Sequence, residues 1–122
     1  MTKTIMIVDD STSMRQVVSI ALTGAGHTVI ECRDGKDALD KLKGQKINMI
    51  VSDVNMPVMD GISFVKALKE IPAYKFTPVL MLTTESQEAK KAEGKAAGVR
   101  AWMVKPFKED QLLAAVEKLS LP

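Results

Sequence analysis

Acidic side chains follow two separate apolar runs of this sequence. Asp9 and Asp10 come directly after the run Ile5–Val8, and Asp53 closes a later apolar stretch. Carboxylates packed together repel one another, which either raises a pKa or calls for a cation that offsets the charge. Mg²⁺ suits such a group because it prefers hard oxygen ligands. A carboxylate can also act as a nucleophile that accepts a phosphoryl group.

A hydroxyl and an ammonium group follow two further apolar runs. Thr83 and Thr84 end one of them, and Lys105 with Pro106 ends the other. Phosphoryl transfer needs charge neutralisation and positioning more than covalent help, and a metal ion, Lys105 and Thr83 could supply both. If these side chains meet the three carboxylates in one crevice, the group predicts an aspartate phosphorylation site.

The crevice requires the apolar runs to be parallel strands of one sheet. Short apolar runs alternate with helical patterns along the chain, which is typical of a parallel sheet with helices on both faces. Right-handed crossovers then bring all strand ends to one edge, where ligands usually bind. The predicted strands are Ile5–Val8, Thr28–Cys32, Ile47–Val51, Pro78–Leu82 and Ala101–Val104.

Helical spacing and capping residues mark the segments between the strands. Ser11 or Thr12 caps the first predicted helix and Asp34 caps the second, while two more contain Ile62–Leu68 and Leu112–Leu119. The segment Ser86–Gly98 also has a helical pattern. It is rich in lysine and alanine and has almost no large apolar residue, so we expect it to be weakly anchored.

Composition limits the classes of protein that fit. The 122 residues are 46% hydrophobic and 26% charged, so we expect residues 1–122 to form one soluble domain without an output domain. The net charge of +2 is scattered, which argues against nucleic-acid binding. No apolar run approaches the roughly 18 residues of a membrane span, and the single Cys32 excludes an internal disulfide. We therefore expect a cytoplasmic protein.

Four motifs stand out by their order and spacing: Ile7-Val8-Asp9-Asp10-Ser11 followed by Met14-Arg15, then Asp53 to Gly61, then Leu82-Thr83-Thr84, then Lys105-Pro106-Phe107. With these motifs the sequence resembles the receiver domains of bacterial two-component response regulators, most closely the single-domain chemotaxis members. The resemblance covers essentially the whole chain. It implies an α/β, doubly wound, flavodoxin-like fold with five parallel strands in the order 2-1-3-4-5.

The resemblance also implies a role for each matching residue. Asp53 would accept phosphate from a phosphohistidine of a partner histidine kinase. Asp9 and Asp10 would hold Mg²⁺ together with Asp53 and the backbone carbonyl of Asn55. After transfer, Thr83 would bind a phosphoryl oxygen and Lys105 would pair with the phosphoryl group. The peptide bond between Lys105 and Pro106 is cis in such proteins.

Three further positions bear on switching and on the lifetime of the phosphate. Trp102 stands three residues before Lys105, where chemotaxis members usually carry Tyr or Phe. Indole is larger than phenol and only donates a hydrogen bond, so an inward swing toward Thr83 would differ in packing and partner. Asn55 and Glu85 match positions that tune the hydrolysis of phosphoaspartate in relatives.

Several functions remain open at this point. The favoured one is a monomeric phosphoacceptor module, not an enzyme, whose phosphorylation switches binding to a target such as a flagellar motor switch protein; a phosphatase is a further candidate partner. A phosphorelay shuttle that passes phosphate to a histidine phosphotransfer protein is the alternative. A haloacid-dehalogenase-type phosphatase would place a second aspartate two residues after the nucleophile, where this chain has Asn55.

Overall fold

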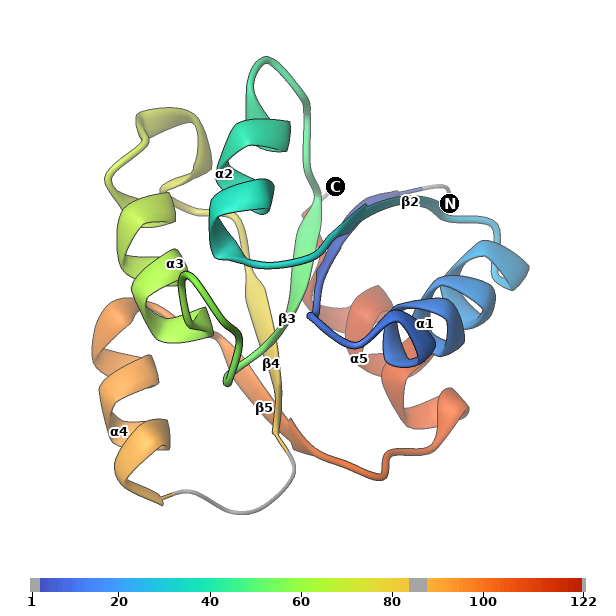
Figure 1. The fold of residues 1–122 in the computed structure, drawn as a ribbon. Helices are drawn as coiled ribbons and strands as arrows, with labels where there is room; N and C mark the ends of the chain where they lie inside the picture. The colour runs from blue at the N-terminus through green and yellow to red at the C-terminus, as the bar shows by residue number, and fades with distance from the viewer. Residues whose placement is uncertain (1–2, 84–87, 122) are drawn as a thin grey trace.

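A five-stranded parallel sheet in the order β2-β1-β3-β4-β5 forms the centre of the protein (Figure 1). The computed structural model describes residues 3–83 and 88–121, without the side chains of residues 88–90. The order confirms the predicted fold class. The strands are β1 (Thr4–Val8), β2 (Thr28–Cys32), β3 (Met49–Asp53), β4 (Val79–Thr83) and β5 (Ala101–Val104).

The third and fourth strands lie further along the chain than the apolar runs predict. The backbone N–H of Asn48 donates to the Thr4 carbonyl at 2.9 Å, and the Asn48 side-chain oxygen accepts from the Thr4 N–H at 2.9 Å. The paired residues of β1 and β3 begin one position later, with Ile5 opposite Met49. At the other end, Asp53 pairs with Leu82 of β4. Asp53 is therefore the last residue of a buried strand, and its pairing with β4 fixes the position of its backbone.

In the described part of the chain, five α-helices cover the two faces of the sheet (Figure 1). One face carries α2, α3 and α4, and the other carries α1 and α5. None of the described helices is long and apolar enough to cross a bilayer. The helices are α1 (Thr12–Gly24), α2 (Gly35–Leu42), α3 (Gly61–Lys69), α4 (Glu88–Ala97) and α5 (Glu109–Leu119), with a 3₁₀ turn at Pro72–Tyr74.

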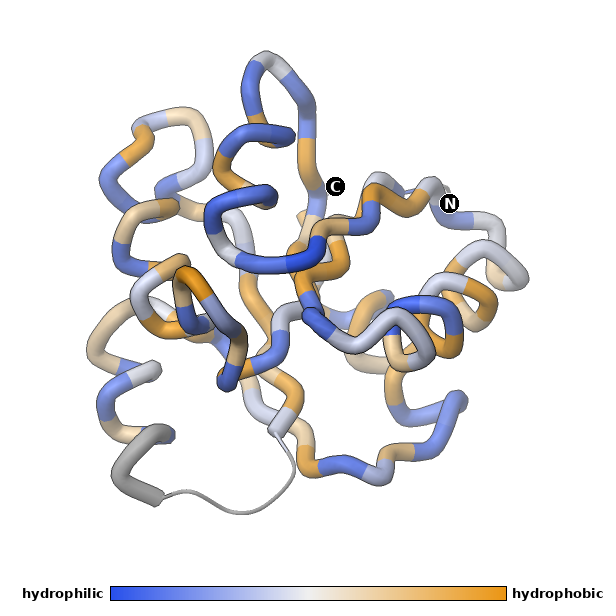
Figure 2. The backbone as a smooth tube through the Cα atoms, in the orientation of Figure 1, coloured by the Kyte–Doolittle hydropathy of each residue, from blue (hydrophilic) through white to orange (hydrophobic). Residues whose placement is uncertain are grey.

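The core consists of two apolar layers, one on each side of the sheet. Successive strand residues point to opposite faces, so Met6 and Val8 face α2 and α3 whereas Ile5 and Ile7 face α1 and α5. All four side chains are at most 1% exposed. Figure 2 shows hydrophobic residues along the strands and a mixture of both kinds in the helices. Burial on both faces explains why the three inner strands, β1, β3 and β4, read as continuous apolar runs.

Capping side chains start three helices directly after the loops that follow the strands. The Ser11 hydroxyl accepts from the backbone N–H of Met14 at 3.3 Å. The carboxylates of Asp34 and Asp60 each accept from the N–H three residues ahead, at 2.8 Å. Each bond satisfies a helix N–H that has no partner within its helix. The three caps therefore fix the residues at which α1, α2 and α3 begin.

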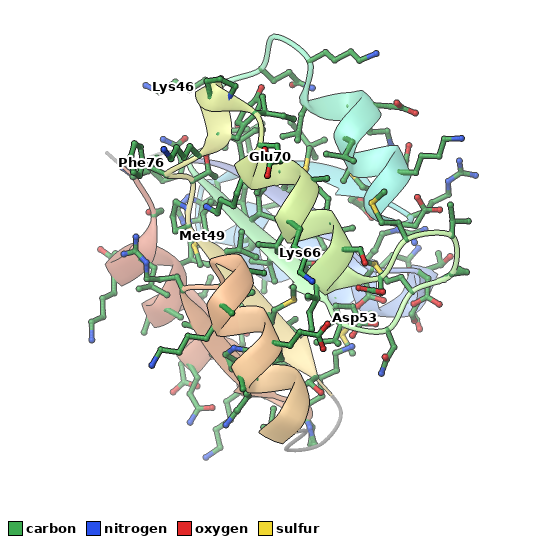
Figure 3. All side chains as sticks on the ribbon, turned by 90° about the vertical axis from the view of Figure 1, so that its left-hand side faces the viewer. Lys46, Met49, Asp53, Lys66, Glu70 and Phe76 are labelled. Atoms are coloured by element: carbon green, nitrogen blue, oxygen red, sulfur yellow. The ribbon has the colours of Figure 1, made fainter. Side chains whose placement is uncertain are left out.

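The helix α4 packs beside α3 and covers the end of the sheet at β5 (Figure 3). The Lys66 ammonium of α3 lies 4.0 Å from the Glu93 carboxylate of α4, and both side chains are at least half exposed. Such an exposed pair stabilises little. Figure 3 also shows Asp53 and Phe76 on opposite sides of the molecule. Asp53 is the last residue of β3 and Phe76 precedes β4, so Asp53 lies on the side where the carboxyl ends of the strands meet.

Candidate functional site

Three carboxylates meet at the carboxyl edge of the sheet. Asp9 and Asp10 follow β1, Asp53 ends β3, and these two strands are neighbours. One oxygen of each residue lies within 4.8 Å of the others. The Asp9 side chain is 3% exposed and that of Asp53 is 13% exposed, whereas Asp10 faces solvent. The structure thus brings together the three acids that the sequence placed at separate strand ends.

Lys105 reaches into this acidic group from the loop after β5. Its Nζ lies 3.4 Å from Asp9 Oδ2 and 3.4 Å from Asp53 Oδ1, and its side chain is only 13% exposed. The following bond to Pro106 is cis. The backbone N–H of Lys105 donates to the Thr83 carbonyl at 2.6 Å, which fixes the lysine to the end of β4.

Charge in the crevice is out of balance. Burial raises the pKa of Asp53 above its usual range, Lys105 acts in the opposite direction, and the nearby Asp9 carboxylate raises it further. Three carboxylates against one ammonium leave a formal charge of −2. A divalent cation would offset this charge. The donors are hard carboxylate oxygens, and the exposed Asp10 leaves room for water ligands, so the residues fit Mg²⁺.

Backbone groups orient the carboxylates of the buried Asp9 and the partly buried Asp53. The Ser11 N–H donates to Asp9 Oδ1 at 2.9 Å, and the Val54 N–H donates to Asp53 Oδ1 at 2.9 Å. The ammonium of Lys105 also donates to Oδ1 of Asp53. Among the described residues, no donor is therefore bonded to the other oxygen, Oδ2. Oδ2 is therefore the oxygen of Asp53 best placed to act on an incoming group.

The start of α3 packs directly against the backbone of Asp53. The Gly61 N–H donates to the Val54 carbonyl at 2.8 Å, and a Cβ on Gly61 would lie 2.2 Å from the Asp53 carbonyl oxygen. Only glycine permits this approach. In the same loop Val58 has a φ of 69°, an unfavourable left-handed conformation for a β-branched residue, and it is 79% exposed.

Thr83 and Trp102 lie on the same face of the sheet, the one covered by α4. In the ladder between β4 and β5, Trp102 pairs with Met81, two residues before Thr83, and side chains two apart share a face. Thr83 is 1% exposed, whereas Trp102 is partly buried against the core. The benzo ring of Trp102 packs on Gly94 of α4, where a Cβ would lie 2.4 Å from Cζ2.

Of the remaining sequence-predicted positions, Asn55 is exposed in the loop after Asp53, and Glu85 lies outside the described residues.

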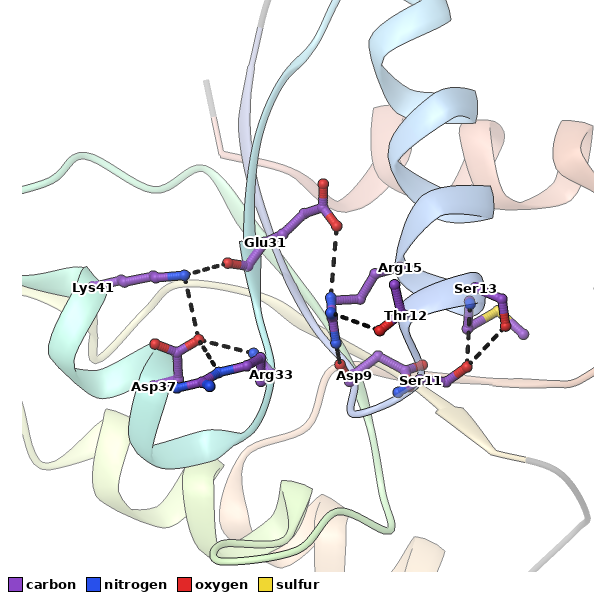
Figure 4. Close-up of polar contacts among 10 residues, drawn as sticks. Asp9, Ser11, Thr12, Ser13, Arg15, Glu31, Arg33, Asp37 and Lys41 are labelled. Atoms are coloured by element: carbon purple, nitrogen blue, oxygen red, sulfur yellow. Dashed lines mark hydrogen bonds and ion pairs between the residues drawn. The ribbon is translucent and has the colours of Figure 1, made fainter.

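The sequence singled out Arg15 only as part of a motif. In the structure its guanidinium binds the backbone of Asp9 (Figure 4). Its place on the helix after the acidic pair, with an acid on the neighbouring strand, is the only signal that could have indicated this contact.

The fold, with an acidic crevice and a lysine at the carboxyl ends of its strands, defines a class of parallel α/β domain, and comparison with known proteins shows which family it is. The sequence model described as Response regulator receiver domain matches residues 5–117. The chain belongs to this family. It is a CheY-like signalling domain rather than an enzyme of the classical kind.

Chemotaxis proteins are among its relatives. A chemotaxis protein CheY homolog of Campylobacter jejuni is 36% identical over 115 residues, which cover 93% of this chain and 88% of that protein. The chemotaxis response regulator CheY4 of Vibrio cholerae is 48% identical, with a TM-score of 0.91 and coverage of 98% and 99% of the two chains.

A more distant structure shares the fold. The receiver domain of the sensor histidine kinase PA1611 from Pseudomonas aeruginosa is 24% identical, with a TM-score of 0.90 and coverage of 98% of both chains. That structure is described with a magnesium ion coordinated in its active-site cleft.

Proposed function

We propose that Asp53 is the phosphoacceptor of a response regulator that is phosphorylated by a partner histidine kinase. The observation that carries this proposal is the meeting of three carboxylates and Lys105 at one sheet edge. Oδ2 of Asp53 forms a bond to phosphorus while the bond from phosphorus to a histidine nitrogen of the kinase breaks. The phosphoryl group thereby moves from nitrogen to the carboxylate oxygen.

Magnesium is the proposed cofactor. Asp9, Asp10 and Asp53 would hold it, together with the backbone carbonyl of Asn55. The ion would offset negative charge on the carboxylates and on the phosphoryl oxygens. Support comes from the hard-oxygen donor set and from the magnesium ion named for the related PA1611 receiver domain.

Lys105 and Thr83 would receive the phosphoryl group. The ammonium of Lys105 already contacts Asp53 at 3.4 Å, so it can pair with an anionic oxygen placed on that carboxylate. The hydroxyl of Thr83 would donate to another phosphoryl oxygen. Asn55 and Glu85 would set how fast water removes the group, so that the protein slowly dephosphorylates itself.

The phosphorylated domain would signal through protein contacts. Trp102 is the proposed switch residue, because it shares the Thr83 face of the sheet and packs against α4. A target protein would then bind this region with altered affinity. The names of the relatives favour a chemotaxis output, with a flagellar motor switch protein as target, over a phosphorelay shuttle.

The central test is phosphate incorporation on two matched variants. Asp53→Asn removes the proposed nucleophile, whereas Asp60→Asn alters an exposed carboxylate nearby that caps α3, a task that asparagine also performs. With Mg²⁺ and a small phosphodonor, mass spectrometry should detect acid-labile phosphate on the wild type and Asp60→Asn but not on Asp53→Asn. Undiminished phosphate on Asp53→Asn would contradict the assignment.

A second experiment separates the two outputs. Phosphorylated protein is offered to a flagellar motor switch protein in a pull-down and, separately, to a histidine phosphotransfer domain. Phosphorylation-dependent capture by the motor protein supports the chemotaxis role. Rapid loss of phosphate to the histidine domain, without such capture, supports the relay.

A further inference from the structure

Arg15 lies in the first turn of α1, beside Asp9 (Figure 4), and its side chain is only 13% exposed. Its Nη1 donates to the backbone carbonyl of Asp9 at 2.6 Å, and its Nη2 donates to the Thr12 hydroxyl at 3.3 Å. Its Nε lies 3.6 Å from a carboxylate oxygen of Glu31 on β2. The guanidinium therefore joins α1, the end of β1 and the edge strand β2.

A largely buried guanidinium is costly unless all its contacts are well made. Here the shortest contact goes to Asp9, a proposed metal ligand, rather than to the acid on β2. A charged donor bonded to a carbonyl is stronger than a neutral pair. The geometry indicates that the main task of this side chain concerns Asp9.

The contact completes the anchoring of Asp9. The N–H of Asp9 donates to the Cys32 carbonyl at 3.1 Å, and one carboxylate oxygen accepts from Ser11. With Arg15 on the carbonyl, both backbone groups and one side-chain oxygen of Asp9 are held from three directions. Little rotation of this residue remains, so its other carboxylate oxygen, Oδ2, keeps a constant place beside Lys105.

We infer that Arg15 is a positioning residue for the cation site, acting through the backbone of Asp9. The inference rests on the proposed function, since it concerns the same site. Glu31 in turn orients Arg15: its backbone carbonyl accepts from the Lys41 ammonium at 2.7 Å, which ties this part of β2 to α2. Outer contacts of this kind typically change metal affinity by about 10- to 100-fold.

The test is Mg²⁺ titration of the full chain by calorimetry. Arg15→Gln removes the charged fork, and Arg33→Gln is the matched control, because Arg33 carries the same charge on a side chain that is 76% exposed. We expect the dissociation constant of Arg15→Gln to rise by about 10- to 100-fold and that of Arg33→Gln to stay near the wild-type value. Circular dichroism confirms that each variant is folded at the titration temperature.

Arg15→Lys separates positioning from charge. Lysine keeps the positive charge but not the planar fork that contacts three groups at once, so its Mg²⁺ affinity should stay clearly below that of the wild type. Wild-type affinity in Arg15→Gln or in Arg15→Lys would overturn the inference. If Arg15→Gln does not fold, Arg15→Lys alone decides. Absence of Mg²⁺ binding in the wild type would instead refute the proposed cation site.

Discussion

Replacing Gly94 with alanine tests how tightly Trp102 is held against α4. A Cβ at this position would lie 2.4 Å from Cζ2 and 3.2 Å from Cη2 of the indole. Carbon atoms in contact sit about 3.5–4.0 Å apart, so the ring or the helix must move by about 1 Å or more. The substitution therefore perturbs the proposed switch residue without touching the acidic crevice.

Two opposing effects set the magnitude. Forcing an extra methyl group into a packed site costs about 1–3 kcal/mol. Replacing glycine with alanine inside a helix stabilises the folded state by about 1 kcal/mol. The free energy of unfolding of Gly94→Ala should therefore fall by up to about 2 kcal/mol. Gly24→Ala is the control, because Gly24 lies in the last turn of α1 and has no heavy atom within 4 Å of its added Cβ.

Denaturant titration and the emission spectrum of the only tryptophan provide the two readouts. Gly24→Ala should be at least as stable as the wild type with unchanged emission. Gly94→Ala should shift the emission to longer wavelength, because the displaced indole meets more water. If Gly94→Ala instead gains stability as Gly24→Ala does and keeps the wild-type spectrum, the packing argument is refuted.

Two further predictions concern strain and pH. Val58→Asn should raise the free energy of unfolding by about 1 kcal/mol, since asparagine tolerates the left-handed conformation that costs valine stability; an unchanged denaturation midpoint would contradict this. Burial acts to raise the pKa of Asp37, but the hydrogen bond from the Arg33 N–H and the nearby Lys41 outweigh it and hold the pKa below its ordinary 3.8. The stability that Asp37 contributes is thus complete above pH 3.8 and is lost as the pH falls through its lowered pKa. Asp37→Asn should be less stable than the wild type at pH 7, and the gap should narrow in acid, as thermal unfolding across that range would show.

Much of the fold follows from local pattern. The strands Thr28–Cys32 and Ala101–Val104 have the predicted bounds, and the helix caps at Ser11 and Asp34 are present. Both strands are edge strands and only partly buried, so their bounds follow from the turn-forming residues beside them rather than from burial. Capping depends on residues only three apart. The starts of β3 and β4 were less predictable, because hydrogen-bond partners on other strands decide where a ladder begins.

The chemistry of the site also follows from residue types. Carboxylates at 9, 10 and 53 with a lysine at 105 indicate charge, metal preference and a phosphoacceptor, because those properties belong to the side chains themselves. Parallel strand order was enough to predict that they would meet. The sequence by itself therefore determined the fold class and which charged residues meet, and it predicts the kind of site.

Only the tertiary structure decided which contacts tune that site. Three contacts join separate elements of the structure. They are the 2.6 Å hydrogen bond from Arg15 to the Asp9 carbonyl, the packing of Trp102 on Gly94, and the close approach of Gly61 to the Asp53 carbonyl. Each depends on how elements pack to within a few tenths of an ångström. Residue type and spacing do not encode such distances, because dense packing arises from the whole core at once.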